Sequence, residues 1–380
     1  MVRLRILQVT PYYHPHAGGV ESHVRAIATE FVREGHVVTV LTSRFDRRLP
    51  AEETIDGVRV VRAPTLAVAW NTPIDAGTRR LIRAIPADVI HLHYPPPLTA
   101  HFALRGLGPD RPPVVLTYHC DLYLAGPLGR LATGLYERLI LPGTLRGVDR
   151  IIVHTRSYGQ TSRALAGRPL EIVPSSVDLA RFHPAPADPA LRRALGLDGR
   201  RLLAFTGRLV PHKGLDALLR AVAQLPEDVA LLLIGRGPGR GSLEASARRL
   251  GVLDRVRFLS EVGDDALADH LRLAELFVFP SQNRLEGFGL AVAEAMAVGL
   301  PVLIADMPGV REVIEPGTEG LLIEPMNPDD LAEKVRTLLG DPATRARMGA
   351  AARRRAEARY GVETVAGELI RRYQALRAAG

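Results

Sequence analysis

Two glutamates eight residues apart, Glu286 and Glu294, follow a run of apolar residues that reads as a strand. Glu286 falls in the loop after that strand, and Glu294 lies about a turn and a half into the helix that follows. Carboxylates at such places can accept hydrogen bonds from vicinal hydroxyls, as acidic residues do with ribose. Gly287 and Gly289 let backbone amides approach a ligand at the helix N-terminus, which suits phosphate. Taken alone, Glu294 is better explained as a capping or ion-paired residue.

Two cations, Arg208 and Lys213, stand in a second loop of this kind, Gly-Arg-Leu-Val-Pro-His-Lys-Gly, directly after another apolar run. Lysine is rare in this chain, because the only other one is Lys334. A guanidinium offers a fork to phosphate oxygens, and an ammonium is a compact mobile charge. The alternative is two solvated loop cations.

The N-terminal half offers two further loops of this kind. His119-Cys120-Asp121 follows an apolar strand pattern, and the pair Gly18-Gly19 precedes a helical pattern. Paired glycines let a ligand approach amides at the positive end of a helix, although an ordinary tight turn explains them equally. A lone histidine is more often structural than catalytic, and Cys120 is interpreted as a small packed residue.

Together, cations for a diphosphate, a helix N-terminus and carboxylates for two sets of sugar hydroxyls describe a nucleotide-sugar site. No Asp-x-Asp pair occurs in the sequence, so a carboxylate-held metal is not indicated. Arg208 and Lys213 supply positive charge in its place.

The elements that must position these residues repeat as short Val/Ile/Leu runs separated by helical patterns, which is typical of parallel sheets covered on both faces. A proline-rich stretch at residues 182–189 interrupts the repeat. We therefore predict two Rossmann-like α/β domains, residues 1–185 and 186–380. Residues 328–378 are predicted to be helical, and the last helix, at about 361–378, is a candidate to pack back on the first domain. The predicted strands cover residues 4–10, 37–41, 58–62, 88–92, 114–118, 151–153, 202–206, 229–234, 256–259, 276–279 and 301–304.

Composition narrows the class of protein. A chain of 380 residues exceeds one ordinary core, and its 24% charged residues are typical of globular domains. No apolar run is long enough to span a bilayer, no signal peptide is recognised, and there is a single cysteine, so a cytoplasmic protein is expected. The net charge of +8 suits a phosphorylated substrate or an anionic membrane. Nucleic acid fits less well, because no basic helix carries base-reading residues and aromatics are only 5%.

Over nearly its whole length the chain resembles glycosyltransferase family 4, retaining enzymes of the GT-B fold. The resemblance rests on the glutamate pair in Pro-Ser…Glu-Gly-Phe-Gly-Leu…Glu-Ala-Met, on Gly-Arg…Lys-Gly upstream, and on Gly-Gly-Val-Glu near the start. It implies two doubly wound domains facing across a cleft, a nucleotide-diphospho-sugar donor, no metal, and transfer with retention.

The resemblance also implies roles for individual residues. Those expected to bind the donor are Gly19, Arg208, Lys213, Phe288, Gly289, Leu290 and Glu294. Glu286 is expected to contact sugar hydroxyls, and His119 to contact the transferred sugar, positioning and stabilising rather than acting as a general base. The acceptor belongs to the N-terminal domain, with Tyr13, Gly18 and Asp121 as candidate contacts. Its expected walls are loops near residues 11–18, 44–50, 70–75, 94–98 and 121–127.

Finer points of specificity are less sharply indicated. The segment 281–286 is longer than the family's usual form and resembles bacterial polysaccharide-assembly members, many of them mannosyltransferases, so GDP-mannose is favoured over UDP-glucose. Glu261 stands where a glycine often precedes the base-contacting loop, which leaves the base open. Residues 122–150 mix apolar residues with Arg130, Arg138 and Arg146, and we expect this region to touch anionic lipid near a lipid-linked acceptor, or to be an ordinary surface helix.

Four alternatives are weighed against this interpretation. A sugar-nucleotide epimerase or a phosphorylase could use the same architecture, and a non-catalytic sugar-nucleotide or glycan-binding module could have kept it. A dehydrogenase is disfavoured, because no strand leads into Gly-x-Gly-x-x-Gly with an acidic residue about 20 positions later.

Overall fold

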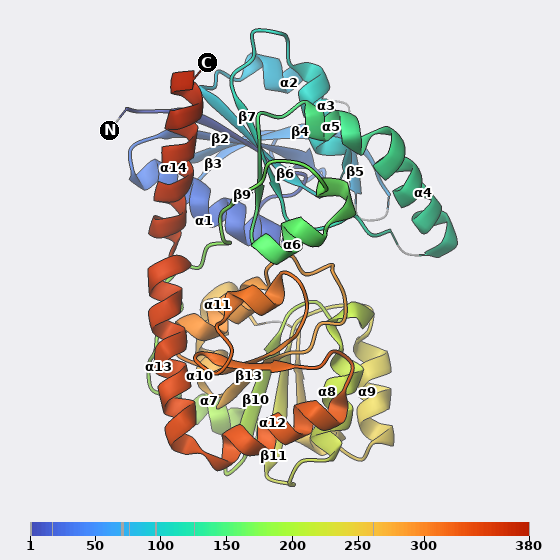
Figure 1. The fold of residues 1–380 in the computed structure, drawn as a ribbon, viewed down its shortest axis with the longest axis vertical. Coiled ribbons are helices and arrows are strands. Elements are labelled where there is room, and N and C mark those ends of the chain that lie inside the picture. The colour runs from blue at the N-terminus through green and yellow to red at the C-terminus, as the bar shows by residue number, and fades with distance from the viewer. Residues whose placement is uncertain are drawn as a thin grey trace. The chain divides into compact units, whose positions relative to one another are not determined.

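A computed structural model of the chain describes residues 2–16, 18–69, 72–75, 77–95, 97–124, 126–260 and 262–379. Positions 17, 70, 71, 96, 125 and 261, which fall in loops singled out above, lie outside these ranges. The chain divides into two compact units (Figure 1). Unit 1 comprises residues 1–176 and 362–380, and unit 2 comprises residues 177–361. The prediction placed this boundary at residues 185/186 instead. The difference arises because Phe182, within the proline-rich stretch, is buried in the core of unit 2.

Unit 1 is built on a nine-stranded sheet in its described part, with the order β3-β4-β2-β1-β6-β7-β8-β9 and with β5 paired to β4. All pairs are parallel except β3–β4 and β4–β5. The strands are β1 (Arg5–Val9), β2 (Val37–Arg44), β3 (Glu52–Ile55), β4 (Val58–Ala69), β5 (Thr72–Asp75), β6 (Val89–Tyr94), β7 (Val114–Tyr118), β8 (Arg150–Val153) and β9 (Glu171–Ile172). The helices are α1 (Gly19–Arg33), α2 (Thr78–Ala84), α3 (Pro97–Gly106), α4 (Gly126–Leu139), α5 (Leu141–Arg146), α6 (Arg156–Thr161) and α14 (Val362–Ala379), with the 3₁₀ turn η1 (Arg163–Leu165).

Alternation along the strands of unit 1 divides its core into two layers. In β1, Ile6 packs with α1 and α14, whereas Leu7 packs on the opposite face with α2, α3 and α5. In β6, Val89 and Ile90 alternate in the same way. Side chains of successive residues point to opposite faces of a strand, so apolar residues at every position cover both faces. The C-terminal helix α14 is part of unit 1, and its Val365, Leu369 and Tyr373 are fully buried there.

Unit 2 is built on a six-stranded parallel sheet with the order β12-β11-β10-β13-β14-β15. Its strands are β10 (Arg201–Thr206), β11 (Val229–Ile234), β12 (Val256–Leu259), β13 (Leu276–Phe279), β14 (Val302–Ala305) and β15 (Gly320–Ile323). Its helices are α7 (Pro189–Ala194), α8 (Leu215–Ala223), α9 (Arg240–Arg249), α10 (Leu267–Arg272), α11 (Leu290–Ala297), α12 (Pro328–Gly340) and α13 (Pro342–Arg359). The 3₁₀ turns are η2 (Pro211–Lys213), η3 (Leu253–Arg255), η4 (Asp264–Ala266) and η5 (Val310–Val313).

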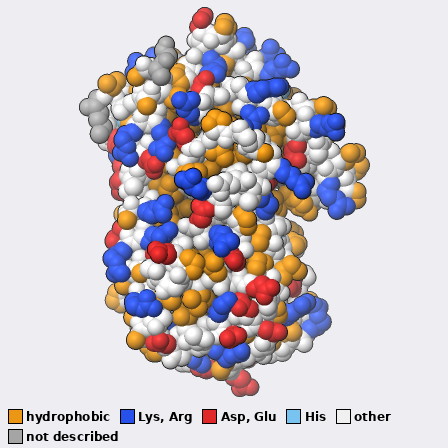
Figure 2. All heavy atoms as spheres, in the orientation of Figure 1, with side chains coloured by type: hydrophobic (Ala, Val, Ile, Leu, Met, Phe, Trp, Pro, Cys, Tyr) orange, Lys and Arg blue, Asp and Glu red, His pale blue; other side chains and the backbone are white. Residues whose placement is uncertain are grey.

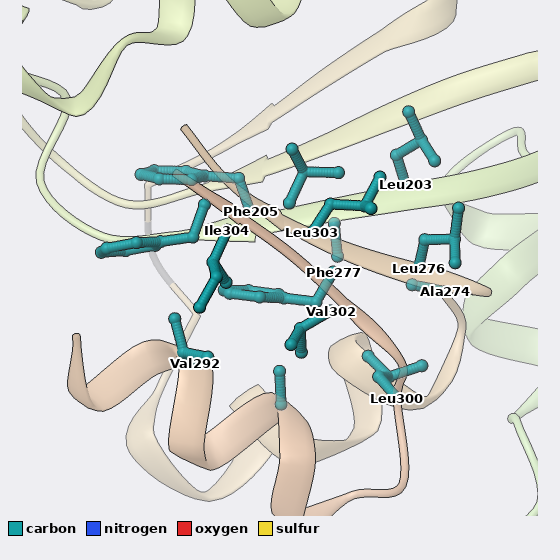
Figure 3. Packing of buried hydrophobic residues seen from close by; sticks show 14 of the residues in the cluster. Leu203, Phe205, Ala274, Leu276, Phe277, Val292, Leu300, Val302, Leu303 and Ile304 are labelled. Atoms are coloured by element: carbon teal, nitrogen blue, oxygen red, sulfur yellow. The ribbon is translucent and has the colours of Figure 1, made fainter. Parts of the chain in front are cut away.

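The core of unit 2 fixes the strand ends that carry the candidate donor residues. Val292 of α11 faces the apolar side chains of the central strands, among them Phe277 of β13 and Ile304 of β14 (Figure 3). Strand β10 pairs with β11 on one side and β13 on the other. The loops that follow these three strands therefore leave the same edge of the sheet, where ligands of doubly wound sheets bind.

Candidate active site

The loop after β10 and the loop after β13 touch in unit 2. Gly214 ends η2 with φ +72° and begins α8. A Cβ at this position would overlap the carbonyl oxygen of Pro280, so only glycine lets the two loops approach so closely. The Gln282 amide donates to the His212 carbonyl over 2.8 Å, which joins the loops a second time.

Across this junction, Lys213 Nζ forms an ion pair with Glu286 Oε1. The ammonium also lies 4.7 Å from the ring centroid of Phe279, and His212 Nε2 lies 3.6 Å from the same carboxylate oxygen. Both partners are largely buried. Burial favours the neutral carboxyl of Glu286, but the charge of Lys213 and the hydrogen bonds from His212 and Lys213 outweigh it, so the pKa of Glu286 lies below its ordinary value. The structure thus brings together a predicted phosphate ligand and a predicted sugar ligand.

Arg208, the other predicted phosphate ligand, projects from the same loop as Lys213. Its side chain is exposed and has no hydrogen bond or ion pair within the described residues. Gly207, with φ +145°, precedes it, and a Cβ there would come within 3.7 Å of Lys213 Nζ. Arg208 is therefore available to an anionic ligand without first losing an internal partner.

The start of α11 has the backbone form that the sequence predicted for a phosphate-binding turn. Gly289 caps the helix with φ +83°, and Leu290 is its first residue. Phe288 is buried and packs edge-to-face on Tyr360, with ring centroids 5.3 Å apart. Glu294 is half-buried in the second turn of α11. The structure places these residues after β13 with Glu286, and their contacts with a donor remain predictions.

The sequence interpretation missed a third loop, Gly235-Arg-Gly-Pro-Gly239, which follows β11. A Cβ at Gly235 would overlap the Gly207 carbonyl oxygen, and one at Gly237 would overlap that of Leu209. The Gly239 amide donates to the Leu209 carbonyl over 2.9 Å. Three glycines directly after a strand were the available signal, because such spacing marks close approach of backbones.

In unit 1, the predicted donor-binding turn opens α1. Gly18 is the N-cap residue and Gly19 the first helical residue, and a Cβ at Gly19 would meet nothing within 4 Å. The Ser22 amide donates to the Gly18 carbonyl over 2.9 Å, so the three preceding amides have no partner of this kind. Tyr13, a candidate acceptor contact, is fully buried, and burial raises the pKa of its phenol well above the ordinary value.

His119 follows β7 directly, as predicted, but it is not an isolated side chain. It is 8% exposed, and both its ring nitrogens bond to other histidines: Nδ1 lies 2.8 Å from His154 Nε2, and Nε2 lies 3.1 Å from His93 Nδ1. Asp121, the third acceptor candidate, accepts hydrogen bonds from the hydroxyls of Tyr118 and Ser162. The side chains of His119 and Asp121 therefore have their hydrogen-bond partners within unit 1.

Among the described residues, no group of three or more His, Cys, Asp or Glu side chains is arranged to hold a metal ion. None of the described helices combines the length and the apolar character required to cross a bilayer. Glu261, which bears on the choice of base, lies outside the described residues.

Two parallel α/β units with candidate ligands at the ends of their strands define a two-domain nucleotide-sugar enzyme of the GT-B class, and comparison with known proteins identifies the family. The model described as Glycosyltransferase Family 4 matches residues 17–181, and that described as Glycosyl transferases group 1 matches residues 188–355. The GDP-mannose-dependent alpha-(1-6)-phosphatidylinositol monomannoside mannosyltransferase of Mycobacterium tuberculosis is 30% identical, over 96% of this chain and 97% of the relative. The phosphatidyl-myo-inositol mannosyltransferase of Mycolicibacterium smegmatis is also 30% identical, over 99% and 95%.

Solved structures agree on the fold. Sucrose-phosphate synthase from Thermosynechococcus elongatus superimposes with a TM-score of 0.82 at 24% identity and covers 100% of both chains. HepE from Anabaena, in complex with UDP and glucose, gives 0.80 at 21% identity, over 98% of this chain and 100% of the other. The chain belongs to glycosyltransferase family 4 and is a retaining hexosyltransferase that uses a nucleotide-sugar donor. The predicted GT-B fold and enzyme class are confirmed.

Proposed function

We propose that the protein transfers mannose from GDP-mannose to a lipid-linked acceptor at an anionic membrane surface, without a metal ion. The main observation that supports a nucleotide-sugar donor is the contact of Lys213 with Glu286. In a sugar nucleotide, the distal phosphate is bonded directly to the anomeric carbon of the sugar. A phosphate ligand and a ligand of the hydroxyl next to the anomeric carbon can therefore be immediate neighbours, as these two side chains are.

Binding a diphosphate here would reorganise the pair. The ammonium of Lys213 would turn toward the phosphate oxygens, and Arg208 would add a planar fork from the exposed side of the loop. Glu286, released from part of its ion pair, would accept hydrogen bonds from sugar hydroxyls. The two cations would stabilise the charge that develops on the departing diphosphate. Transfer with retention is then expected by attack from the face of the leaving group, through an oxocarbenium-like transition state.

The choice of mannose rests on the relatives. Both mycobacterial relatives are named as mannosyltransferases, and one is named as GDP-mannose-dependent. Their names also supply an acceptor class, phosphatidylinositol and its mannosides. UDP-glucose is the competing donor.

The surface of α4 supports a membrane-bound acceptor. Four leucines at helical spacing, Leu128, Leu131, Leu135 and Leu139, are 57–74% exposed, so the described residues of unit 1 leave most of this stripe uncovered. Arg130 and Arg138 on the same helix are exposed and have no ion pair among the described residues. Figure 2 shows hydrophobic side chains beside Lys and Arg side chains where α4 lies in Figure 1. An apolar stripe with flanking cations is typical of a helix that lies in an anionic interface.

Transfer from radiolabelled GDP-mannose or UDP-glucose to vesicles containing phosphatidylinositol tests this proposal, with and without EDTA. We expect a mannosylated lipid from GDP-mannose, formed equally in EDTA. Exclusive use of UDP-glucose would refute the donor, transfer only to soluble acceptors would refute the membrane acceptor, and loss of turnover in EDTA would refute metal independence.

A further inference from the structure

Five buried histidines gather on one face of the unit 1 sheet: His23, His91, His93, His119 and His154. His91 and His93 occupy alternate positions on β6, and His119 and His154 directly follow β7 and β8. All four therefore lie on the face of the sheet that α1 and α14 cover. His23 comes from α1 and meets His93, His119 and His154 edge-on, with ring centroids 5.5–6.3 Å apart.

A carbonyl at one end fixes the direction of the hydrogen bonds in this cluster. His154 Nδ1 lies 2.9 Å from the Val173 carbonyl oxygen, which can only accept, so the proton of His154 is on Nδ1. Its Nε2 then accepts from His119 Nδ1, and His119 Nε2 in turn accepts from His93 Nδ1. Each neutral ring donates through Nδ1 and accepts through Nε2.

Gln8 completes the series at the other end. His93 Nε2 lies 2.6 Å from the Gln8 side-chain amide, assigned as oxygen, while the amide nitrogen is buried without a partner. Exchanging the amide oxygen and nitrogen of Gln8 lets the amide donate to His93 and removes the unpaired group. His91 is separate but also occupied, bonding Thr117 through Nε2 and Tyr373 through Nδ1.

His23 is the exception. The backbone amide of Ser176 donates to its Nδ1 over 3.2 Å, with the Ser176 hydroxyl 3.0 Å from the same nitrogen. An amide N–H can only donate, so Nδ1 of His23 carries the lone pair and Nε2 carries the proton. That Nε2–H has no hydrogen-bond partner among the described residues, although the residue is only 3% exposed. An imidazole N–H that has no internal acceptor is available to donate to a ligand.

We propose that His23, and not His119, presents the ligand-facing N–H of this cluster, donating through Nε2 to a phosphoryl oxygen of the substrate bound at the start of α1. The inference rests on the proposed function, which supplies a substrate with phosphate groups. His23 follows Gly19 by four residues, so the two lie on one helix face, and a helical side chain leans toward the preceding turn. The unpaired amides of that turn and the imidazole N–H then form one set of donors at the start of α1, beside the Glu21 carboxylate, which pairs with His16 over 3.0 Å.

Burial keeps the set neutral. It lowers the pKa of His23 well below the ordinary value, and the neighbouring His154 and His91 lower it further. Since a protonated His23 would set an Nδ1–H against the Ser176 N–H, the described hydrogen bonds also require the neutral ring. Both ring nitrogens of His119 are hydrogen-bonded to other histidines. We therefore assign His119 as a positioning residue, whose fixed ring packs edge-on against that of His23.

Two substitutions at His23 separate its two nitrogens. His23→Asn keeps an acceptor for the Ser176 amide but removes the Nε2–H, whereas His23→Gln keeps an N–H near the position of Nε2. We expect kcat/KM to fall about tenfold to a hundredfold in His23→Asn, the range for a hydrogen bond to a charged oxygen, and to be largely retained in His23→Gln. His101→Asn is the matched control, because His101 lies on α3 and bonds Thr144 outside the cluster. The change in KM for the sugar nucleotide against that for the acceptor tells which substrate carries the phosphoryl oxygen.

Nitrogen-15 NMR of the histidine rings supplies a readout that needs no turnover. The wild-type protein should show His23 protonated on Nε2 and His119 on Nδ1, and added GDP or UDP should shift the His23 Nε2–H resonance. A His23 proton on Nδ1 overturns the inference. So does a His23→Asn variant that turns over and binds like the wild type. Failure of the wild type to bind any nucleoside diphosphate or use any sugar nucleotide would instead refute the proposed function, leaving the proton assignment to be judged by NMR.

Discussion

The candidate site of unit 2 is built from charged side chains, whereas that of unit 1 is built from neutral ones. In unit 2 a lysine and a glutamate form an ion pair in a largely buried loop junction, and an exposed arginine stands nearby. In unit 1, five neutral imidazoles from α1, β6 and the residues that follow β7 and β8 contact one another and uncharged partners. Fixed charge suits the diphosphate binding that we propose for unit 2. Neutral rings can orient a sugar or a phosphoryl oxygen without holding product by strong charge attraction.

The difference predicts two separate responses to acid. A buried neutral histidine binds protons more weakly than the unfolded chain does, so it costs stability once the pH falls below its ordinary pKa. The carboxylate of Glu286 has a pKa below its ordinary value of 4.5, so its ion pair weakens only at still lower pH. Unit 1 should therefore open first on acidification.

The largest expected effect is this loss of stability in unit 1 between pH 6.5 and 4. Burial lowers the pKa of His154 from 6.5 to about 4 and that of His91 to about 3. The contribution of each of these two neutral histidines to the stability of unit 1 is complete above pH 6.5. It declines as the pH falls toward the lowered pKa of that histidine. At 1.36 kcal/mol per unit, His154 alone contributes a loss of about 3 kcal/mol by pH 4. Hydrogen exchange of each unit, measured across this range, checks the prediction.

The matched variant for this experiment is His91→Gln, which removes one titrating ring from unit 1. Its stability should change less between pH 6.5 and 4 than that of the wild type. Equal pH dependence, or earlier exchange of unit 2, would contradict the contrast between the units.

The second effect concerns the charged pair itself. Lys213→Ala removes a proposed diphosphate ligand and leaves the Glu286 carboxylate largely buried without its partner, so both activity and stability should fall. We expect a loss of at least about a hundredfold in kcat/KM, or roughly 2.7 kcal/mol of transition-state stabilisation. Steady-state kinetics and thermal unfolding check it. The double variant Lys213→Met with Glu286→Gln should regain stability but not activity.

Lys334→Ala is the control for charge, since Lys334 is the only other lysine and pairs with Asp330 on α12. It should leave both measurements close to wild type. Activity in Lys213→Ala comparable with that of Lys334→Ala would remove Lys213 from the donor site.

The same contrast explains how much the sequence could predict. The charged loops of unit 2 follow apolar strands and lie within short motifs, so Arg208, Lys213 and Glu286 could be named in advance. Several central strands, such as β7 and β11, begin and end at the predicted residues. The strands β3 and β5, which pair with β4 in the described structure, were missed because Glu-Glu-Thr-Ile and Thr-Pro-Ile-Asp are not apolar runs.

The histidine cluster of unit 1 needs information from separate strands, which local motifs lack. His91-Leu92-His93 does show the alternation of a strand with one polar face, and that signal was available. The register that sets His91 beside Gln8, and His93 beside Thr117, comes only from pairing of β6 with β1 and β7. The sequence therefore led to His119 but not to its partners or to His23.

A smaller effect is expected from Arg208, whose side chain has no internal partner to lose. Arg208→Ala should lower kcat/KM about tenfold by removing charge-assisted hydrogen bonds to phosphate, and should leave the thermal unfolding temperature unchanged. Arg208→Lys should recover part of the loss, because an ammonium keeps the charge but not the fork. Arg220→Ala, an exposed arginine on α8, is the matched control. Isothermal titration with GDP provides the measurement, and unchanged affinity in Arg208→Ala would place the arginine outside the donor site.

The smallest expected effect concerns an apolar contact between unit 1 and the membrane, for which we propose no counterpart in unit 2. Leu131→Asp with Leu135→Asp places two charges in the exposed stripe of α4 and should weaken binding to phosphatidylinositol vesicles about fivefold at low salt. Because both side chains are exposed, stability should stay within about 0.5 kcal/mol. Leu66→Asp, equally exposed on β4, is the control, and vesicle sedimentation at low and high salt measures the partition. Since binding by Arg130 and Arg138 is screened by salt whereas leucine burial is not, the double variant should lose most of the residual binding at high salt. Equal sedimentation of the double variant and Leu66→Asp would restrict α4 to a surface helix without a membrane role.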